Sequence, residues 1–195
     1  MEYFLSHWLE WFGVITGLLY LYLEIKQRPS MWIIGFISSL VYVIVFFQTK
    51  FYADGVLNSY YVAVSVYGFW LWLFGKSNTK DEKPVQNYIR IVPKTFFILL
   101  AVTLVLFVTI YFVLTNFTDS PIPLGDSLVT SLSIVATWML AKKIIEHWVV
   151  WVVVNGLSVF LFIVKGLYPT SFLYLCYGVL SVVGYFQWKR FKKEE

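Results

Sequence analysis

Seven apolar stretches, each long enough to cross a membrane as a helix, occupy most of this 195-residue sequence. A transmembrane helix needs about 20 mostly apolar residues to span the hydrocarbon core of a bilayer. Hydrophobic residues make up 59% of the chain and charged residues 13%, and a water-soluble fold of this size cannot bury that much apolar surface. We predict an all-α integral membrane protein, a seven-transmembrane helical bundle. The predicted spans are Trp8 to Ile25, Met31 to Gln48, Leu57 to Phe74, Thr95 to Leu114, Ser127 to Ala141, Trp148 to Val164 and Ser171 to Trp188.

Polarity separates two of these spans from the others. The fourth, Thr95 to Leu114, carries no charge, and it is the most clearly apolar. The fifth, Ser127 to Ala141, is the most polar because five serine and threonine residues are scattered through it. Such a helix is stable in a membrane only if its hydroxyl groups face protein or a water-filled cavity. We therefore expect the fifth span to be the least exposed to lipid.

The basic residues predict the orientation in the membrane. With seven spans, only Lys50 and Lys165 lie on the same side as the N-terminus, and the other thirteen lysines and arginines lie on the opposite side. Loops rich in Lys and Arg stay on the cytoplasmic side of a membrane. We therefore expect a multi-pass protein of the cell (inner, cytoplasmic) membrane, with its N-terminus outside and its C-terminus in the cytoplasm. The net charge of +4 then reflects topology and not nucleic-acid binding. The segment Met1 to Trp11 holds no Lys or Arg, so we expect no cleaved signal peptide.

The sequence contains an internal repeat at an offset of 116 residues. Without gaps, positions 26–72 match positions 142–188 at eleven of 47 places. The Trp, Tyr, Gly and Lys matches carry the most weight, because Leu, Val and Phe match by chance in so apolar a chain. The identical pairs are Lys26 and Lys142, Trp32 and Trp148, Val43 and Val159, Phe46 and Phe162, Tyr52 and Tyr168, Leu57 and Leu173, Tyr61 and Tyr177, Ser65 and Ser181, Val66 and Val182, Gly68 and Gly184, and Trp72 and Trp188.

This repeat predicts a parallel 3+1+3 architecture. Spans one to three (residues 1–75) form one bundle, and residues 76–125 hold a cytoplasmic linker, the connecting fourth span and an outer loop. Spans five to seven with a basic cytoplasmic tail (126–195) form the second bundle. The small sugar transporters called SWEETs have this arrangement, and such repeats bind substrate at the interface of their halves. A duplicated scaffold without a transport role is the alternative.

A polar and aromatic stripe marks the sixth span. Trp148, Trp151 and Asn155 fall within about 60° of arc on a helix of 100° per residue. Two indoles and one amide on a single face can stack on a flat heteroaromatic ring, attract its positive charge and hydrogen-bond its substituents. The structural alternative makes Trp148 an interfacial residue and Asn155 a hydrogen-bonding partner of another helix.

A second cluster lies where the third span enters the membrane from outside. Asp54 is placed to cap that helix or to lie in its first turn, with Asn58 one turn deeper and Tyr61 on a neighbouring face. In the repeat, Thr170 occupies the position of Asp54, and we interpret it as the cap of the seventh span. Capping and ligand binding are both open for Asp54 and Thr170, as are a structural and a binding role for Asn58.

Other chemistries find little support in the sequence. The histidines, His7 and His147, lack metal-ligand spacing, and no phosphate-binding loop or hydrolase motif is present. We therefore predict neither an enzyme nor a bound metal or cofactor, and the single cysteine, Cys176, is interpreted as a packing residue. Glu146 follows Lys142 by four residues, a spacing that favours an ion pair. A passive carrier or channel fits these features best.

The stripe and its flanking motifs resemble the PnuC family of vitamin transporters over essentially the whole chain. The W-x-x-W-x-x-x-N motif at Trp148–Asn155 and the YAD turn at Tyr52–Asp54 carry this resemblance. Agreement at Lys142–Trp148 and in KGLYPT at Lys165–Thr170 adds to it. One departure is Asn58, where many members have glutamine, so the amide is retained on a side chain one methylene shorter.

The resemblance implies a nicotinamide riboside transporter of the cell membrane that takes part in NAD salvage. It implies a homotrimer that works as a uniporter by facilitated diffusion, with the imported nucleoside trapped by cytosolic phosphorylation. Trp148, Trp151 and Asn155 would line the substrate site, together with our candidates Asn58, Tyr61 and Thr170. A phosphorylated substrate should be rejected, since no Lys or Arg lies in mid-membrane. A thiamine carrier of the same family, or a non-transporting membrane receptor or assembly subunit, is the alternative function.

Overall fold

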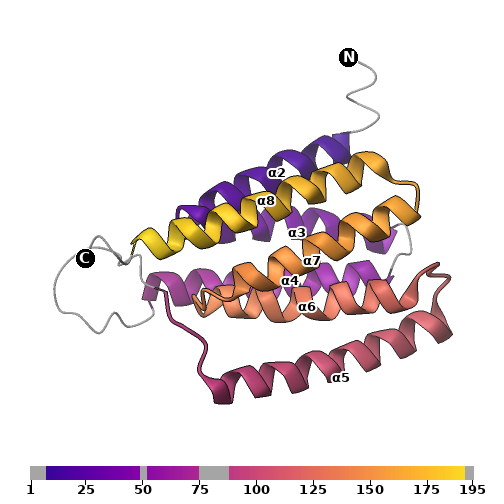
Figure 1. Cartoon of the computed structure of the whole chain (residues 1–195). Helices are drawn as coiled ribbons and strands as arrows, with labels where there is room; N and C mark the ends of the chain where they lie inside the picture. Colours follow the sequence, from indigo (N-terminus) through magenta and orange to yellow (C-terminus); the bar gives the residue numbers. More distant parts are fainter. Residues whose placement is uncertain (1–7, 49–51, 75–87, 192–195) are drawn as a thin grey trace. The chain divides into compact units, whose positions relative to one another are not determined.

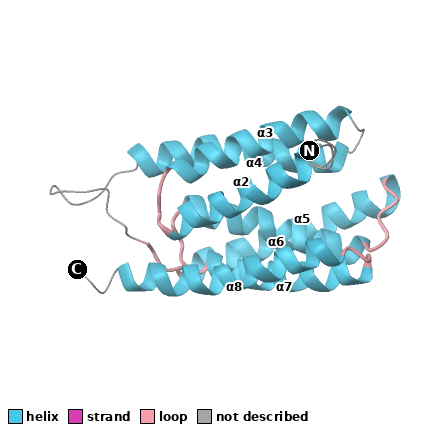
Figure 2. Ribbon diagram, turned by 90° about the horizontal axis from the view of Figure 1, so that it is seen from above, coloured by secondary structure: helices cyan, strands magenta, loops and turns pink. Residues whose placement is uncertain are grey.

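The computed structural model describes residues 8–48, 52–74 and 88–191, and within them the chain is helical apart from its turns and one isolated bridge (Figures 1 and 2). All seven predicted spans are confirmed as helices, and their ends differ from the prediction by at most five residues. The helices are α2 (Trp8–Ile25), α3 (Ser30–Gln48), α4 (Tyr52–Phe74), α5 (Pro93–Phe117), α6 (Pro123–Ala141), α7 (His147–Val164) and α8 (Tyr168–Phe191).

Five of these helices, α4 to α8, contain stretches long and apolar enough to cross a membrane. The other two contain shorter apolar stretches, Phe12–Ile25 and Ser30–Val45. As predicted, α5 is the most apolar of the five, and it has no buried residue. Pro93 opens it and Pro123 opens α6, because proline fits the first turn of a helix, where its missing N–H has no intrahelical partner.

The chain folds as two compact units, Met1–Gln86 and Asn87–Glu195. In the first unit, α3 packs extensively against α4 and less extensively against α2. In the second unit, α5 packs against α6, α6 against α7, and α7 most extensively against α8. The pair of helices with the largest mutual contact in each unit is therefore the pair that the internal repeat makes equivalent.

The turns after α2 and α6 share one backbone conformation at the repeat offset. Gln27 and Lys143 have positive φ angles of 51° and 55°. The N–H of Gln27 donates to the Glu24 carbonyl at 2.9 Å, and the N–H of Lys143 donates to the Leu140 carbonyl at 2.8 Å. The next N–H in each turn reaches five residues back, at 2.9 Å in both. This is the Schellman pattern, which satisfies the last carbonyls of a helix.

The same repeat appears in the packing of tryptophan on glycine. In the second unit, the rings of Trp148 and Trp188 meet edge to face at 5.7 Å, and Trp148 lies over Gly184. In the first unit, Trp32 meets Trp72 at 5.8 Å and lies over Gly68 in the same way. The internal repeat is thus present in three dimensions, while the parallel 3+1+3 arrangement in a membrane stays a prediction.

The polar helix α6 is the most buried of the five long apolar helices, as its sequence predicts. Its hydroxyl groups bond to carbonyls of their own helix; for example, Ser131 donates to Leu128 at 3.0 Å and Thr137 to Ser133 at 2.8 Å. This self-bonding leaves a smooth surface of small residues. Four of the five hydroxyl residues are buried: Ser127, Ser131, Ser133 and Thr137.

Several sequence predictions fall outside the described residues. These are the position of Lys50, the side chain of Asp54, and residues 75–87 of the charged loop before α5.

Candidate functional site

The three residues of the α7 stripe have different surroundings. Trp148 is fully buried, where His147 lies 4.7 Å away by ring centroid and Trp188 lies 5.7 Å away. Its ring rests so closely on Gly184 that a Cβ there would come within 2.5 Å of it. Trp148 therefore joins α7 to α8. Its Nε1 is buried and has no hydrogen-bond partner in the described part of the chain.

Asn155 lies one turn beyond Trp151 and two turns beyond Trp148 along α7, and it is also buried. Its Nδ2 donates to Ser181 Oγ at 3.3 Å, and the Ser181 hydroxyl donates to the Tyr177 carbonyl at 2.8 Å. The interhelical hydrogen bond of the structural alternative is therefore present. An amide has two donors and one acceptor oxygen, so the one amide bond to Ser181 leaves capacity for a ligand. Trp151 is only partly buried, on the same stripe.

Thr170 lies at the opposite end of the α7–α8 pair from Trp148. The Ser171 hydroxyl donates to the Val159 carbonyl at 3.1 Å, which ties the start of α8 to the second half of α7. Gly184 is 14 residues beyond Thr170, a distance of about 21 Å along a helix. Trp151 and Asn155 therefore lie between Thr170 and the Trp148–Gly184 contact along the pair.

One sequence prediction about Thr170 is wrong. Helix α8 begins at Tyr168, and the N–H of Ser171 donates to the Leu167 carbonyl at 2.9 Å. Thr170 thus lies inside the first turn and does not cap the helix. The sequence pointed to it through its repeat position, whereas the turn before α8 ends earlier, at Gly166 with a φ of 72°.

Asn58 and Tyr61 lie one turn apart on α4, in the first unit, and both are partly buried. The Tyr61 ring lies 5.6 Å from that of Tyr60. Tyr61 and Glu24 are also close enough to Tyr20 to interact with it electrostatically. The structure therefore gathers polar groups of α2 and α4 within the first bundle. Glu24, near the end of α2, is buried as well.

The two units differ where the candidate residues stand. The repeat aligns Trp151 with Gly35, Asn155 with Ser39, and Asn58 with Tyr174. At Gly35, an added Cβ would meet the Tyr20 ring at 3.0 Å and Ser65 Oγ at 3.2 Å, so the first unit has no room for an indole there. The tryptophan–glycine packing is duplicated, but the indole–amide pair Trp151 and Asn155 is unique to the second unit.

Sequence reasoning missed the contacts that Glu146 and Lys142 make, and then the ion pair of Lys165. The predicted pair of Lys142 and Glu146 gives way to other partners: Glu146 Oε2 accepts from the N–H of Ile91 at 3.0 Å, and the Lys142 ammonium lies 5.9 Å from the centroid of the Trp138 ring. Lys165 pairs with Asp126 at 2.7 Å. No local spacing signals this ion pair, because its partners are 39 residues apart.

Comparison with known proteins places this geometry in a family. A family model described as "Nicotinamide mononucleotide transporter" matches residues 7–190. The chain belongs to this family. Its matched region includes every described helix except the end of α8, and both tryptophan–glycine pairs lie within it.

Individual relatives cover nearly the whole chain. The nicotinamide riboside transporter PnuC of Escherichia coli is 26% identical over 93% of this chain and 84% of its own. The PnuC of Neisseria mucosa is 27% identical over 95% and 73%, respectively. The riboflavin/roseoflavin transporter RibM of Streptomyces davaonensis is 26% identical over 93% and 84%. The crystal structure of the vitamin B3 transporter PnuC matches with a TM-score of 0.75, at 26% identity, over 96% of this chain and 83% of that one.

These comparisons confirm the PnuC family that the sequence motifs indicated. They also support a multi-pass membrane protein that transports a small vitamin-like substrate, since the family and these relatives are named as transporters.

Proposed function

We propose that this protein carries nicotinamide riboside across the cytoplasmic membrane by facilitated diffusion, and that cytosolic phosphorylation retains the imported nucleoside. In this proposal the protein is a homotrimeric uniporter, with the N-terminus outside and the C-terminus inside. The observation that carries the proposal is the indole–amide pair Trp151 and Asn155, which the repeat does not duplicate. A duplicated fold explains shared packing residues, whereas the repeat has glycine and serine in place of Trp151 and Asn155, and polar side chains inside membrane helices commonly mark functional sites.

The six candidate residues have graded roles in this proposal. Trp151 stacks on the pyridinium ring, where cation–π attraction reaches about 2 kcal/mol once water is excluded. Asn155 reads the carboxamide with the amide capacity left by its bond to Ser181. Trp148 supports this face from its position over Gly184. Asn58, Tyr61 and Thr170 stay candidate residues of the proposal with no contact to the ribose assigned, since Asn58 and Tyr61 belong to the first unit and Thr170 lies at the other end of the α7–α8 pair from Trp148.

Charge favours the nucleoside over its phosphate. Within the seven described helices, Lys and Arg occur only at Lys94, the second residue of α5, and at Lys189 and Arg190 in the last turn of α8. A phosphate carries up to two negative charges at neutral pH, and burying them without a cation costs several kcal/mol. We therefore expect nicotinamide mononucleotide to bind far more weakly than nicotinamide riboside.

A second candidate substrate is a larger aromatic vitamin. The RibM relative is named for riboflavin and roseoflavin, and thiamine has a flat pyrimidine and a cationic thiazolium that suit the same stripe. A membrane receptor without transport is a candidate from another class. Binding alone does not separate a receptor from a carrier, so liposome uptake must be measured as well.

The test is calorimetric binding to the purified protein with nicotinamide riboside, nicotinamide mononucleotide, thiamine and riboflavin. Trp151→Ala should weaken nicotinamide riboside binding by roughly 10- to 30-fold, which corresponds to 1.4–2 kcal/mol. Trp70→Ala is the matched control, because Trp70 is 58% exposed on α4 and should leave affinity unchanged. Unchanged affinity in Trp151→Ala, or tighter binding of another vitamin, would contradict the proposal.

A further inference from the structure

Helix α7 carries a charged residue at each end, and both side chains reach toward the segments that flank α5. Glu146 is its N-cap residue and Lys165 its C-cap residue. A carboxylate at a helix N-terminus and an ammonium at a C-terminus both complement the helix dipole. That complementarity alone needs no third partner, yet each side chain makes a specific bond beyond its own helix.

At the first end, the residues before α5 lie along the α6–α7 turn. Ile89 forms a parallel bridge with Ile144: its N–H donates to the Lys143 carbonyl at 2.9 Å, and its carbonyl accepts from Ile145 at 3.0 Å. Two residues later, the N–H of Ile91 donates to Glu146 Oε2 at 3.0 Å. The entry to α5 is therefore bonded to the residue that caps α7.

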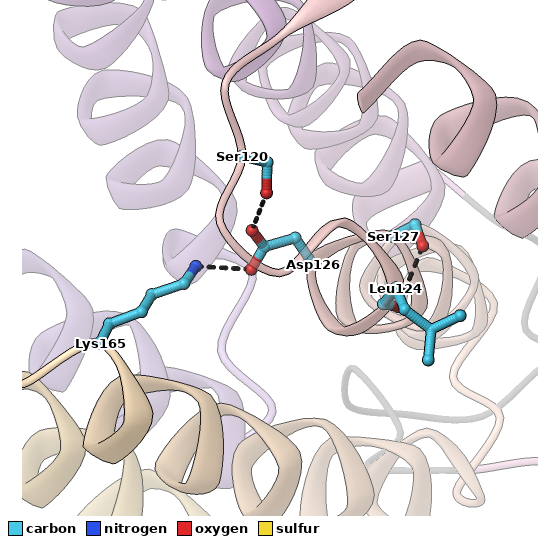
Figure 3. A network of polar contacts seen from close by, with 5 residues as sticks. All are labelled: Ser120, Leu124, Asp126, Ser127 and Lys165. Carbon is cyan, nitrogen blue, oxygen red and sulfur yellow. Dashed lines mark hydrogen bonds and ion pairs between the residues drawn. The ribbon is translucent and has the colours of Figure 1, made fainter. Parts of the chain in front are cut away.

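At the other end, an ion pair makes the corresponding connection (Figure 3). Lys165 Nζ lies 2.7 Å from Asp126 Oδ1, in the first turn of α6, and Asp126 Oδ2 accepts from the Ser120 hydroxyl at 2.7 Å. Ser120 is three residues past the end of α5. The side chains of Lys165 and Asp126 are 22% and 27% exposed, so salt screens this pair less than it screens a surface pair.

Close packing supports the second connection. Leu161, one turn before Lys165, lies against Gly125, where a Cβ would overlap its side chain. The start of α6 and the end of α7 are therefore in direct contact beside the ion pair. The two connections are separated by the length of α7, which is about 27 Å for 18 residues.

The connections matter because, among the described helices, α5 packs only against α6, where Leu99 and Leu106 lie against the core residues Val135 and Met139. The bonds at its two ends link it to α7 through the α6–α7 turn and the start of α6. Two bonds at opposite ends of a helix restrict both its tilt and its axial shift, as a single bond cannot.

We infer that Glu146 and Lys165 are positioning residues, which bond the two ends of α7 to the segment before α5 and to the start of α6, and thereby hold the Trp151–Asn155 face of α7 in its binding orientation. This inference rests on the proposed function for its effect on affinity. The geometric part, a fixed register between α5 and α7, is independent of the substrate.

The first experiment measures nicotinamide riboside affinity by calorimetry in full-length Lys165→Met and Asp126→Asn. Each variant removes one charge of the ion pair and should weaken binding about tenfold. Lys165→Arg, which keeps a positive charge for Asp126, should hold affinity to within about threefold of wild type, which a general loss of stability on substitution at this position would not produce. Asp119→Asn is the matched control, since Asp119 is an exposed carboxylate in the same loop, and it should not change affinity.

The same experiment applies at the other end through Glu146→Gln, which keeps the shape and one acceptor oxygen but removes the charge. Glu146→Gln should also weaken nicotinamide riboside binding about tenfold relative to wild type, and Glu146→Asp should lose less affinity than Glu146→Gln. Unchanged affinity in Glu146→Gln and in both single variants of the ion pair would overturn the positioning role.

The second experiment needs no substrate. Spin labels are placed at Leu104→Cys on α5 and Val153→Cys on α7, both exposed positions, after Cys176→Ser. The distance distribution should be narrow in this background and broader once Lys165→Met or Glu146→Gln is added. Equal widths would overturn the inference. If the wild-type protein binds no nicotinamide riboside but the distributions broaden, the proposed function fails while the tethering of α5 to α7 holds.

Discussion

At the scale of single residues, glycine decides how closely α3 and α4, or α7 and α8, approach each other. Trp148 lies directly over Gly184, and Trp32 lies over Gly68, with ring atoms about as close as 2.5 Å to where a Cβ would stand. Here glycine is required for its lack of a side chain and not for its backbone freedom. One of the largest side chains in each helix pair is thus accommodated by the smallest residue.

Gly184→Ala should therefore destabilise the second unit by about 1–3 kcal/mol, the usual cost of overpacking a core. Gly68→Ala should act similarly in the first unit. Chemical unfolding in detergent micelles measures the change. Gly156→Ala is the control, since no atom lies within 4 Å of a Cβ at that position on α7, and alanine favours a helix over glycine by up to about 1 kcal/mol. Equal effects at Gly184 and Gly156 would refute the close-packing argument.

The orphan indole groups show what such packing costs. Trp32 Nε1 and Trp148 Nε1 are both buried and unpartnered within the described residues. A buried donor without an acceptor costs about 1–3 kcal/mol. Because the cost occurs in both units, it belongs to the shared packing motif and not to substrate binding alone.

At the scale of elements, the turns after α2 and α6 place a residue other than glycine in the left-handed conformation. Gln27 and Lys143 adopt this conformation in the first and the second repeat, and it is energetically unfavourable for any residue that has a Cβ atom. Burial also lowers the pKa of the Lys143 ammonium, so the folded chain disfavours its charged form.

Lys143→Gly should raise the free energy of unfolding by about 0.5–1 kcal/mol, because glycine adopts this conformation without the Cβ clash that other residues suffer. Lys142→Gly is the matched control. Lys142 has a φ of −83°, so glycine gains nothing there and should destabilise the turn through backbone entropy. Thermal unfolding of both variants tests this, and a loss of stability in Lys143→Gly would count against it.

Helix α6 shows how an element can be polar and still lie in a membrane protein. The hydroxyl groups of Ser131, Ser133 and Thr137 donate to carbonyls of their own helix three or four residues back. The small side chains then allow close packing against α5 and α7. The sequence alone predicted this burial, since lipid would not tolerate the alternative.

At the scale of the whole molecule, the distribution of basic residues predicts the membrane topology. On the predicted seven-span topology, thirteen of the 15 Lys and Arg residues lie on one side of the membrane. The opposite side carries only the other two basic residues of the sequence. One of them is Lys165, whose charge is neutralised by its ion pair with Asp126.

The chain has a single cysteine, so topology can be tested directly by labelling. In a Cys176→Ser background, Glu195→Cys should react with a membrane-impermeant maleimide only after the cells are opened. Glu2→Cys should react in intact cells. Labelling in the reverse order would invert the predicted orientation, and labelling of both ends in intact cells would rule out an odd number of spans.

The sequence by itself determined which segments form helices and which helices are equivalent in the internal repeat. Spans, the polar character of α6, and the 116-residue repeat all follow from local patterns of hydrophobicity and identity, because a membrane helix satisfies its backbone within itself. The motif of α7 also identified the family. These features depend on neighbours in the chain and need no knowledge of the fold.

Only the tertiary structure decided which side chains meet. Trp148 has the same residue type and spacing as a binding residue, but its contacts with Trp188 and Gly184 make it part of the helix packing. Glu146 has a lysine at ideal helical spacing, yet it bonds to Ile91, 55 residues away. These contacts depend on which distant segment folds next to each side chain and offers it a hydrogen-bonding group or a complementary surface. The local sequence does not specify that segment.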